Sequence, residues 1–188
     1  MKKEKPRKTR SFVEHMITYS FLSRDLHAKR VLELGCGEGY GLQLLSLFAL
    51  RLQGLDNSPK FLRRAQLMQY HCPTVLKKID LDKDLPDLSE VDFVVATELL
   101  EHLEDAHRMV EHCARSGVSL GLSIPHNAPH PLHKHVFMNP AEAKALISPH
   151  YRDVRWFTLR NGIVQKDFPF ISPERYIGIC SPSQTRVV

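Results

Sequence analysis

The sequence predicts an α/β fold of three layers, with a mostly parallel sheet of seven strands between helices on both faces. Short, continuous apolar runs alternate with stretches of helical pattern from residue 30 to residue 180, which is typical of strands buried on both faces. Glycine, proline and polar clusters separate most of these segments, as turns require. The length of 188 residues, 43% of them hydrophobic, suits one domain with a buried core.

The first half of the chain alternates strands with helices. A helix is expected over residues 11–28, followed by strands over 30–34, 52–56 and 74–79 and by helices over 42–50 and 58–70. The apolar run that ends at Leu34 stops at a glycine cluster, which is typical of a buried strand that enters a tight turn. Ser58 places a capping hydroxyl directly before Pro59, which suits the first position of a helix.

The alternation continues through the second half, after an acidic loop over residues 82–90. Strands are expected over residues 91–97, 118–124, 154–159 and 175–180, and helices over 103–115 and 139–147. Asn139 and Pro140, with Glu142, repeat the pattern of a capping residue before proline. In parallel sheets ligands bind beyond the carboxyl ends of the strands, so we expect the functional residues there.

Basic residues are concentrated at the N-terminus. Residues 1–10 contain six Lys or Arg against one Glu, whereas the remaining residues carry equal numbers of basic and acidic side chains. We therefore expect a basic, disordered arm over residues 1–10 and one domain over residues 11–188. The alternative for the arm is attraction to nucleic acid or to an anionic surface. Because the body is formally neutral, the high pI alone is weak support for an RNA enzyme.

Composition also excludes several classes of protein. No apolar run approaches the roughly 20 residues that span a membrane, and the N-terminus lacks the apolar stretch of a secretory signal. The four cysteines are scattered without a CxxC pair, so the sequence predicts neither a disulfide framework nor a zinc site. A cytoplasmic protein with reduced thiols and no membrane span is expected.

Four alternate glycines lie in one loop, ELGCGEGYG at residues 33–41. Glycine is needed where the backbone takes positive φ or where a ligand approaches closely, and this loop lies between a strand and a helix N-terminus. The spacing G-x-G-x-G differs from the G-x-G-x-x-G of dinucleotide-binding oxidoreductases, which disfavours that class. Asp56 ends the next strand, where an acid can accept hydrogen bonds from both ribose hydroxyls. The pattern predicts a site for a nucleoside-containing cofactor.

The sequence resembles the class I S-adenosylmethionine-dependent methyltransferases over about residues 29–180. The motifs that carry the resemblance are VLELGCGEG at residues 31–39, GLDNSP at 54–59, IDL at 79–81, VDFVVATE at 91–98 and SIPHN at 123–127. The resemblance implies a Rossmann-like fold and S-adenosyl-L-methionine as the cofactor. It further implies cofactor-binding residues, which are Glu33, Gly35, Gly37, Gly39, Asp56, Asn57, Asp80, Leu81, Thr97 and Glu98.

The resemblance also implies a role for each of these residues. The three glycines would cradle the cofactor while Glu33 orients its methionine part, and Asp56 and Asn57 would contact ribose and adenine. Asp80 would meet the adenine amino group, with Leu81 beside it as backbone contact and apolar cover; the alternative for Asp80 is a plain turn carboxylate. Thr97 and Glu98 would line the methionine side and the acceptor mouth.

A Glu-x-x-Glu-His motif follows the strand over residues 91–97. If this turn is helical, Glu98, Glu101 and His102 share one face, and such an oxygen-rich set suits Mg²⁺ or Mn²⁺. Without a metal, the same carboxylates suit the first turn of a helix. The motif is similar to that of ubiquinone-pathway O-methyltransferases and small-RNA 2′-O-methyltransferases, which implies a divalent metal. In the RNA enzymes a further histidine binds the metal, and His135 matches it, although Lys134 replaces the usual acid.

Eight of the eleven histidines lie between His102 and His150. Three readings apply to those of the loop: a polar surface loop, a metal ligand, or a general base that faces the methyl acceptor. We choose His135 and His126 as candidate catalytic residues, since the first matches a motif and the second directly follows a strand. His130 and His133 are interpreted as loop residues.

We therefore expect a methyltransferase that methylates a hydroxyl of a small molecule, with assistance from a metal bound by Glu98, Glu101, His102 and His135. RNA 2′-O-methylation is the alternative, and a catalytically silent cofactor-binding subunit is the alternative from another class. A homodimer or an accessory subunit is a further expectation, because the insertions that would recognise an acceptor are short.

Overall fold

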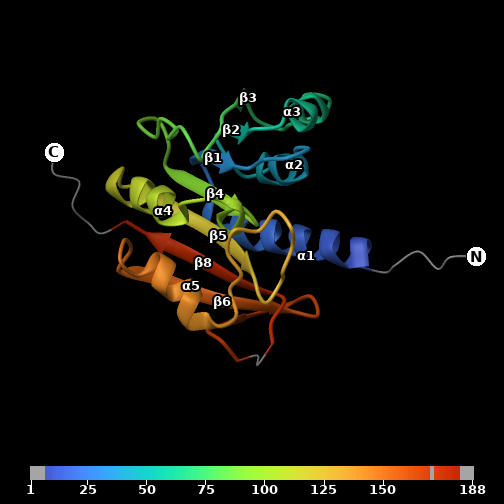
Figure 1. Cartoon of the computed structure of the whole chain (residues 1–188). Coiled ribbons are helices and arrows are strands. Elements are labelled where there is room, and N and C mark those ends of the chain that lie inside the picture. The colour runs from blue at the N-terminus through green and yellow to red at the C-terminus, as the bar shows by residue number, and fades with distance from the viewer. Residues whose placement is uncertain (1–6, 170–171, 183–188) are drawn as a thin grey trace, which may run out of the picture.

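A mixed sheet of eight strands forms the centre of the computed structural model, which describes residues 7–169 and 172–182 (Figure 1). The strands are β1 (Arg30–Leu34), β2 (Arg51–Asp56), β3 (Thr74–Lys78), β4 (Phe93–Thr97), β5 (Ser119–Pro125), β6 (Asp153–Arg160), β7 (Ile163–Lys166) and β8 (Arg175–Ser181). Their order is β3-β2-β1-β4-β5-β8-β6-β7. Strands β1 to β5 are parallel, whereas β8, β6 and β7 join the sheet antiparallel.

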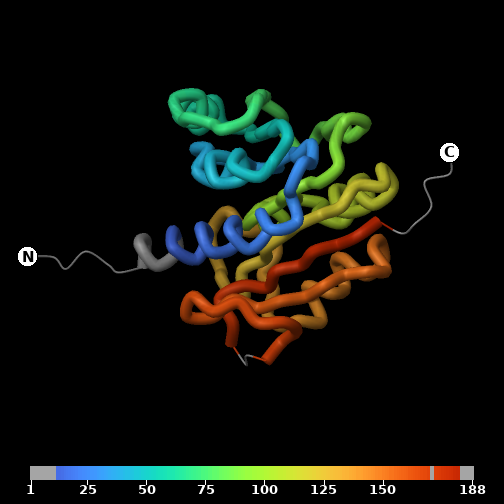
Figure 2. Tube along the Cα trace, turned by 180° about the vertical axis from the view of Figure 1, so that it is seen from behind, coloured from blue at the N-terminus to red at the C-terminus, as the bar shows by residue number. Residues whose placement is uncertain are grey.

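Helices cover both faces of this sheet, as the sequence predicts. On one face lie α1 (Arg7–Leu22), α2 (Tyr40–Leu45) and α3 (Pro59–Ala65), of which α1 crosses in front of the sheet in Figure 2. On the other face lie α4 (Ala106–Arg115) and α5 (Pro140–Ile147), which are in front in Figure 1. Two short 3-10 helices, η1 (Ser23–Asp25) and η2 (Leu100–His102), follow α1 and β4. Each face of the sheet has its own apolar cluster, so the sheet lies between two hydrophobic cores.

The chain reverses its direction of travel across the sheet at β1. From β1 it passes outward to β2 and β3, and then returns to β4, on the other side of β1. Such a switch point leaves an opening beyond the carboxyl ends of β1 and β4, where open α/β sheets bind their ligands. The glycine loop follows β1, and the Glu-x-x-Glu-His motif follows β4. The topology therefore places both motifs at one edge of the sheet.

The sheet has eight strands rather than the predicted seven. The additional strand, β7, forms a hairpin with β6 through Asn161 and Gly162, whose φ angles are 49° and 78°. An Asn-Gly pair between two strand-like runs is the strongest short-range signal for such a hairpin, and the sequence contained it. The exposed pattern of β7 lacks the apolar continuity used to predict the other strands.

Helix α1 begins at Arg7, so its first residues belong to the segment predicted as a disordered arm. That prediction is wrong for residues 7–10, and residues 1–6 lie outside the described residues. The Glu-x-x-Glu-His turn is a single 3-10 turn, and α4 starts only at Ala106. Glu98 lies before this turn and has a φ of 50°, so Glu98, Glu101 and His102 do not share one face of an α-helix.

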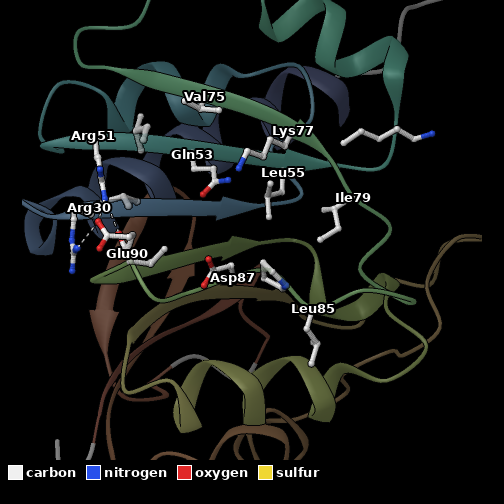
Figure 3. A pocket seen from close by; sticks show the side chains of 15 residues that line it. Arg30, Arg51, Gln53, Leu55, Val75, Lys77, Ile79, Leu85, Asp87 and Glu90 are labelled. Atoms are coloured by element: carbon white, nitrogen blue, oxygen red, sulfur yellow. Dashed lines mark hydrogen bonds and ion pairs between the residues drawn. The ribbon is translucent and has the colours of Figure 1, made fainter. Parts of the chain in front are cut away.

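The connection from β3 to β4, residues 79–92, contains no helix. One sheet face is therefore open over β2 and β3, and a hollow of about 480 Å³ lies there. Figure 3 shows the side chains that line it, including Gln53 of β2, Val75 of β3 and Leu85 of the connecting loop. None of the predicted cofactor-binding residues lines this hollow. The candidate site described below is elsewhere.

Candidate active site

The glycine loop has the backbone that its sequence predicts. Gly35, Gly37 and Gly39 all have positive φ, at 69°, 53° and 88°. A Cβ atom on Gly39 would lie 2.5 Å from the Tyr70 hydroxyl and 3.0 Å from Ala65 Cβ, so only glycine fits there. A Cβ atom on Gly37 would meet no heavy atom within 4 Å. The loop thus packs tightly on one side and presents bare backbone to open space on the other, as a cradle for a ligand requires.

Asp56 lies beside this loop because β2 pairs with β1 in parallel register. One carboxylate oxygen accepts a hydrogen bond from the Gly37 N–H at 2.9 Å, and the other accepts one from the Ser58 N–H at 2.8 Å. Each oxygen retains a lone pair, and Asp56 is half-buried. The carboxylate is fixed where an acid can accept hydrogen bonds from ribose hydroxyls. Asn57 is exposed next to it.

Glu33 is fully buried near the end of β1 and has one unpartnered oxygen. Its Oε1 accepts a hydrogen bond from the Tyr19 hydroxyl at 2.5 Å, whereas Oε2 has no hydrogen-bond partner among the described residues. Burial raises the pKa of Glu33 to about 8; the hydrogen bond from Tyr19 opposes this shift, and the negative charge of Asp56 adds to it. A cationic group at Oε2 would satisfy this oxygen and stabilise the carboxylate. The ammonium of a methionine moiety has this chemistry.

Tyr19 of α1 is a site residue that the sequence analysis missed. Its hydroxyl donates to Glu33 and accepts a hydrogen bond from Thr97 Oγ1 at 2.5 Å, which joins α1, β1 and β4. Burial and the charge of Glu33 raise the pKa of Tyr19 well above its usual range, so it stays a donor. Gly41 of α2 leaves room for the Tyr19 ring, since a Cβ there would lie 2.2 Å from its Cζ, but no pattern in the sequence predicts the contact with Glu33.

Asp80 and Leu81 follow β3 but make local contacts. Asp80 forms an ion pair with Lys83 Nζ at 2.6 Å, and this hydrogen bond lowers the pKa of Asp80. Leu81 is 9% exposed and belongs to the apolar cluster on the α4 and α5 face. The described contacts are those of a turn carboxylate and a core leucine. Contact of either residue with adenine stays a prediction.

Glu98 turns away from the other residues of its motif. It has a left-handed backbone, with φ of 50°, and its Oε1 accepts a hydrogen bond from Ser123 Oγ at 3.1 Å. Arg175 Nη1, at the start of β8, lies 3.0 Å from the same oxygen and forms an ion pair with it. Burial raises the pKa of Glu98, and the charge of Arg175 opposes that shift. Glu14 of α1 forms a second ion pair with Arg175, at 3.4 Å.

Three other side chains converge instead. Ligand atoms of Glu101, His102 and His133 all lie within 4.8 Å of one another. Glu101 is 1% exposed, and neither of its carboxylate oxygens has a hydrogen-bond partner among the described residues. Burial raises the pKa of Glu101 to about 8, and the negative charge of Glu98 adds to the shift. An unpartnered buried carboxylate between two imidazoles is suited to a divalent metal.

The two imidazoles of this group are oriented by backbone carbonyls. His102 Nδ1 lies 3.0 Å from the Leu132 oxygen, and His133 Nδ1 lies 2.6 Å from the Ala128 oxygen. A proton on each Nδ1 satisfies these carbonyls and leaves each Nε2 as a free acceptor, which is the usual arrangement of metal-binding histidines. Burial lowers the pKa of His133, so this imidazole favours the neutral form that a metal requires.

The predicted histidine His135 is not in this group. Its side chain is exposed, and its backbone N–H donates to the Glu101 carbonyl at 3.2 Å, as does that of Lys134 at 2.7 Å. These two hydrogen bonds anchor the loop so that His133, two residues earlier, faces Glu101. The sequence match at His135 pointed to the loop that approaches Glu101, but it did not show which histidine of that loop the hydrogen bonds to the Glu101 carbonyl would bring close.

His126, the other predicted catalytic histidine, lies at the end of β5. Its Nδ1 is 2.7 Å from the Tyr176 hydroxyl, and burial raises the pKa of Tyr176 to about 12, so the tyrosine remains a donor. The backbone N–H of His126 donates to the Glu174 carbonyl. These contacts fix the orientation of the ring. A general-base role for His126 or His135 stays a prediction.

The known proteins that this chain is similar to are methyltransferases, in agreement with the geometry of the candidate site. Residues 32–123 match the methyltransferase domain family. A probable S-adenosylmethionine-dependent methyltransferase of Mycobacterium tuberculosis is 36% identical over 104 residues, which cover 55% of this chain and 37% of that protein. A ubiquinone biosynthesis O-methyltransferase of Chromobacterium violaceum is 32% identical over 102 residues, or 48% of this chain and 42% of that protein. The chain thus spans less than half the length of these relatives.

Among solved structures, the complex of the Haloferax volcanii Trm112 methyltransferase activator with a putative methyltransferase matches with a TM-score of 0.71. The identity is 20%, and the match covers 94% of each chain, so it concerns the fold. The sequence matches lie over the glycine loop and Asp56, and the structural match extends over most of the described sheet. Residues 32–123, just under half of this chain, are thus similar to the methyltransferase domain family, and the described residues share the fold of solved S-adenosylmethionine-dependent methyltransferases.

Proposed function

We propose that this chain binds S-adenosyl-L-methionine and transfers its methyl group to a hydroxyl of a small molecule. The observation that carries the proposal is the unpartnered, buried Oε2 of Glu33 next to the bare backbone of Gly37. A buried polar atom without a partner is rare in native proteins and usually marks a ligand site. Both features lie at the switch point of the sheet, where a nucleoside-containing cofactor binds.

Each residue of the cradle has a role in this proposal. The positive-φ glycines let the cofactor approach the backbone, and Asp56 accepts hydrogen bonds from the ribose. Glu33, held by Tyr19, balances the ammonium of the methionine part. The cofactor supplies an electrophilic methyl group that needs no covalent catalysis by the protein. The protein therefore mainly aligns the acceptor and manages its proton.

We further propose that a divalent metal assists the reaction. Glu101, His102 and His133 would hold it, and Glu98 and His135 remain the ligands that the motif resemblance favours. A metal there would lower the pKa of a bound acceptor hydroxyl. Because the converging set contains two imidazoles, it suits Mn²⁺ better than Mg²⁺.

Two alternatives and the assembly state belong to the same proposal. RNA 2′-O-methylation is supported by the basic N-terminus and by the Glu-x-x-Glu-His motif. A catalytically silent cofactor-binding subunit would keep the same cradle. One similar fold is solved with a methyltransferase activator, which supports an accessory subunit for this chain as well; a homodimer is the other option. The scattered free cysteines support the cytoplasm as the compartment.

The proposal is tested by calorimetric titration with S-adenosylhomocysteine and by methyl transfer to a panel of hydroxyl acceptors, with Mn²⁺ and with EDTA. Gly39→Ala should abolish measurable binding, because its Cβ would displace the Tyr70 and Ala65 side chains that support the loop. Gly117→Ala is the matched control: it has a similar φ of 66° but no neighbour within 4 Å, and it lies after α4.

The outcomes separate the alternatives. Binding of S-adenosylhomocysteine by the wild type and by Gly117→Ala, with turnover of the cofactor, supports an enzyme. Binding without turnover of any acceptor identifies a silent subunit, and turnover only with RNA identifies the nucleic-acid alternative. If the wild type does not bind the cofactor, the proposal is wrong.

A further inference from the structure

Helix α1 has two apolar faces. Its inner face contributes Thr18, Tyr19 and Leu22 to the core, all of them buried. A second stripe at helical spacing borders a surface hollow: Phe12, Val13, Met16, Ile17, Ser20, Phe21 and Arg24, of which Ile17 and Phe21 also pack partly against the core. Phe12 and Val13 are each 50% exposed. A surface helix of a globular domain normally has one apolar stripe, so the second indicates something that covers it.

The outer stripe forms one wall of a hollow of about 550 Å³. Leu44 of α2 and Val164 of β7 line the other side. The β6–β7 hairpin lies close to α1, since a Cβ on Gly162 would be 3.6 Å from Ile17 Cδ1. The walls are mainly aliphatic and aromatic, and α1, which forms one of them, lies in front of the sheet in Figure 2.

The charge around this face is positive. Residues 1–10, which precede the stripe in the sequence, contain six Lys or Arg and one Glu. Arg24 lies at the other end of the stripe, 5.2 Å above the Phe21 ring. The one acidic residue of α1, Glu14, does not offset these charges, because it is turned inward to Arg175. An apolar stripe that has Arg24 at one end and that follows a basic sequence attracts an anionic, amphiphilic surface.

We propose that the outer face of α1, together with the basic N-terminus, docks on an anionic phospholipid bilayer. Phe12, Val13 and Met16 would enter the boundary between headgroups and acyl chains, while the cations contact the phosphates. RNA would satisfy the cations but would leave the aliphatic wall of the hollow in water. None of the helices in the described part of the chain is long and apolar enough to cross a membrane, so the contact is peripheral.

The docking surface lies back to back with the candidate active site. The inner face of α1 carries Tyr19, which holds Glu33, and Glu14, which contacts Arg175. A lipid surface on the outer face would therefore contact the same helix that holds these site residues from its inner face. The inference does not depend on methyl transfer, because it rests on the exposed stripe and the charge alone.

The test is sedimentation of the full chain with vesicles of phosphatidylcholine alone and of phosphatidylcholine with phosphatidylglycerol. The wild type should partition at least tenfold better onto the anionic vesicles, and the partitioning should fall as salt rises. The double variant Phe12→Asp/Val13→Asp should lose at least tenfold. Leu67→Asp is the matched control: Leu67 is 85% exposed but lies after α3, away from the stripe.

A second variant, Ser20→Asp, keeps the test valid if the double variant does not fold, since Ser20 is exposed in the same stripe. Equal partitioning onto both kinds of vesicle, or equal loss in Leu67→Asp, would overturn the proposal. So would binding of a single-stranded RNA oligonucleotide without vesicle binding, which would assign the basic segment to nucleic acid. The proposal would also be overturned if the chain does not bind vesicles but forms a dimer in sedimentation velocity that Phe12→Asp/Val13→Asp abolishes. That result would assign the face to a second copy of the chain.

Discussion

The half of the sheet built from β1 to β4 and the half built from β5, β8, β6 and β7 place their functional side chains differently. In the first half, Glu33, Gly37 and Asp56 lie within a few residues of a strand end, and backbone geometry alone brings them together. In the second half, His133 reaches Glu101 only because a long loop is anchored on the Glu101 carbonyl. The first arrangement depends on residues close to the strand ends, whereas the second depends on a tertiary contact between a loop and the turn after β4.

This difference indicates which parts of a site tolerate substitutions. A cradle made of parallel strand ends and positive-φ glycines depends on a few backbone positions. A group assembled by a loop depends on every contact that orients the loop. In this group the converging histidine is His133 rather than the predicted His135, a difference of two residues that no helix or strand boundary reveals. The following predictions test this difference, from the largest expected effect to the smallest.

Arg175→Leu should have the largest effect, in the second half. The substitution leaves Glu98 and Glu14 without their buried cation, and breaking a buried ion pair typically costs about 3 kcal/mol of folding free energy. Urea unfolding at neutral pH measures the loss. Arg155→Leu is the control, since its ion pair with Asp25 is half exposed and should change stability by less than about 1 kcal/mol. Equal effects of the two substitutions would contradict a buried network.

Glu33→Gln tests the half of the site built on β1 to β4. It should weaken binding of S-adenosylhomocysteine by roughly thirtyfold, about 2 kcal/mol, because a charged hydrogen bond to the ammonium is lost. In the wild type the affinity should rise with pH toward 8, as the carboxyl with a pKa of about 8 ionises. Calorimetry at several pH values measures both effects, and a pH dependence that persists in Glu33→Gln would assign the titration to another group.

The same raised pKa of Glu33 has an opposite consequence for the stability of the unliganded protein. The folded chain holds a proton that the unfolded chain has already released, so the stabilising contribution is complete below pH 4.5 and is lost as the pH rises through about 8. Glu101 acts in the same direction. Cofactor binding should therefore protect against unfolding most strongly at the alkaline end.

His133→Ala and His135→Ala distinguish the tertiary arrangement from the sequence match. If Glu101, His102 and His133 hold the metal, His133→Ala should weaken Mn²⁺ binding at least tenfold, whereas His135→Ala should leave it unchanged. Mn²⁺ titration followed by electron paramagnetic resonance measures free metal directly, without need of an acceptor. The reverse result would support the motif match and show that the loop rearranges when metal binds.

Tyr19→Phe should have the smallest effect and tests how far the cradle depends on α1. Loss of one buried hydrogen bond to Glu33 costs about 1 kcal/mol, or roughly fivefold in cofactor affinity. Because that hydrogen bond opposes the shift of the Glu33 pKa, the pH profile of binding should also move to higher pH. Tyr151→Phe is the control, since its buried hydroxyl donates to the Val118 carbonyl in the apolar cluster on the α4 and α5 face. No shift in the profile would make Tyr19 a packing residue only.

The sequence predicts the first half of the molecule well, because apolar runs and glycine spacing act over a few residues. Strand β1 has the predicted bounds, Ser58 accepts the hydrogen bond of an N-cap, and Asp56 meets the glycine loop, although α2 and α3 end at Leu45 and Ala65, before the predicted residues 50 and 70. What could not be predicted involves long-range contacts. Nothing in the local pattern shows that Arg175 draws Glu98 aside, or that Tyr19 reaches Glu33 from another element.

The position of β8 between β5 and β6 has a consequence for how the protein is made. Among the described strands, the hairpin of β6 and β7 pairs with the rest of the sheet through β8, which comes later in the chain than both. During synthesis, β1 to β5 can pair as they leave the ribosome, whereas the hairpin must wait. Until Arg175–Ser181 emerges, β5 and β6 each lack the strand that lies between them, and unpaired strand edges can pair with other chains.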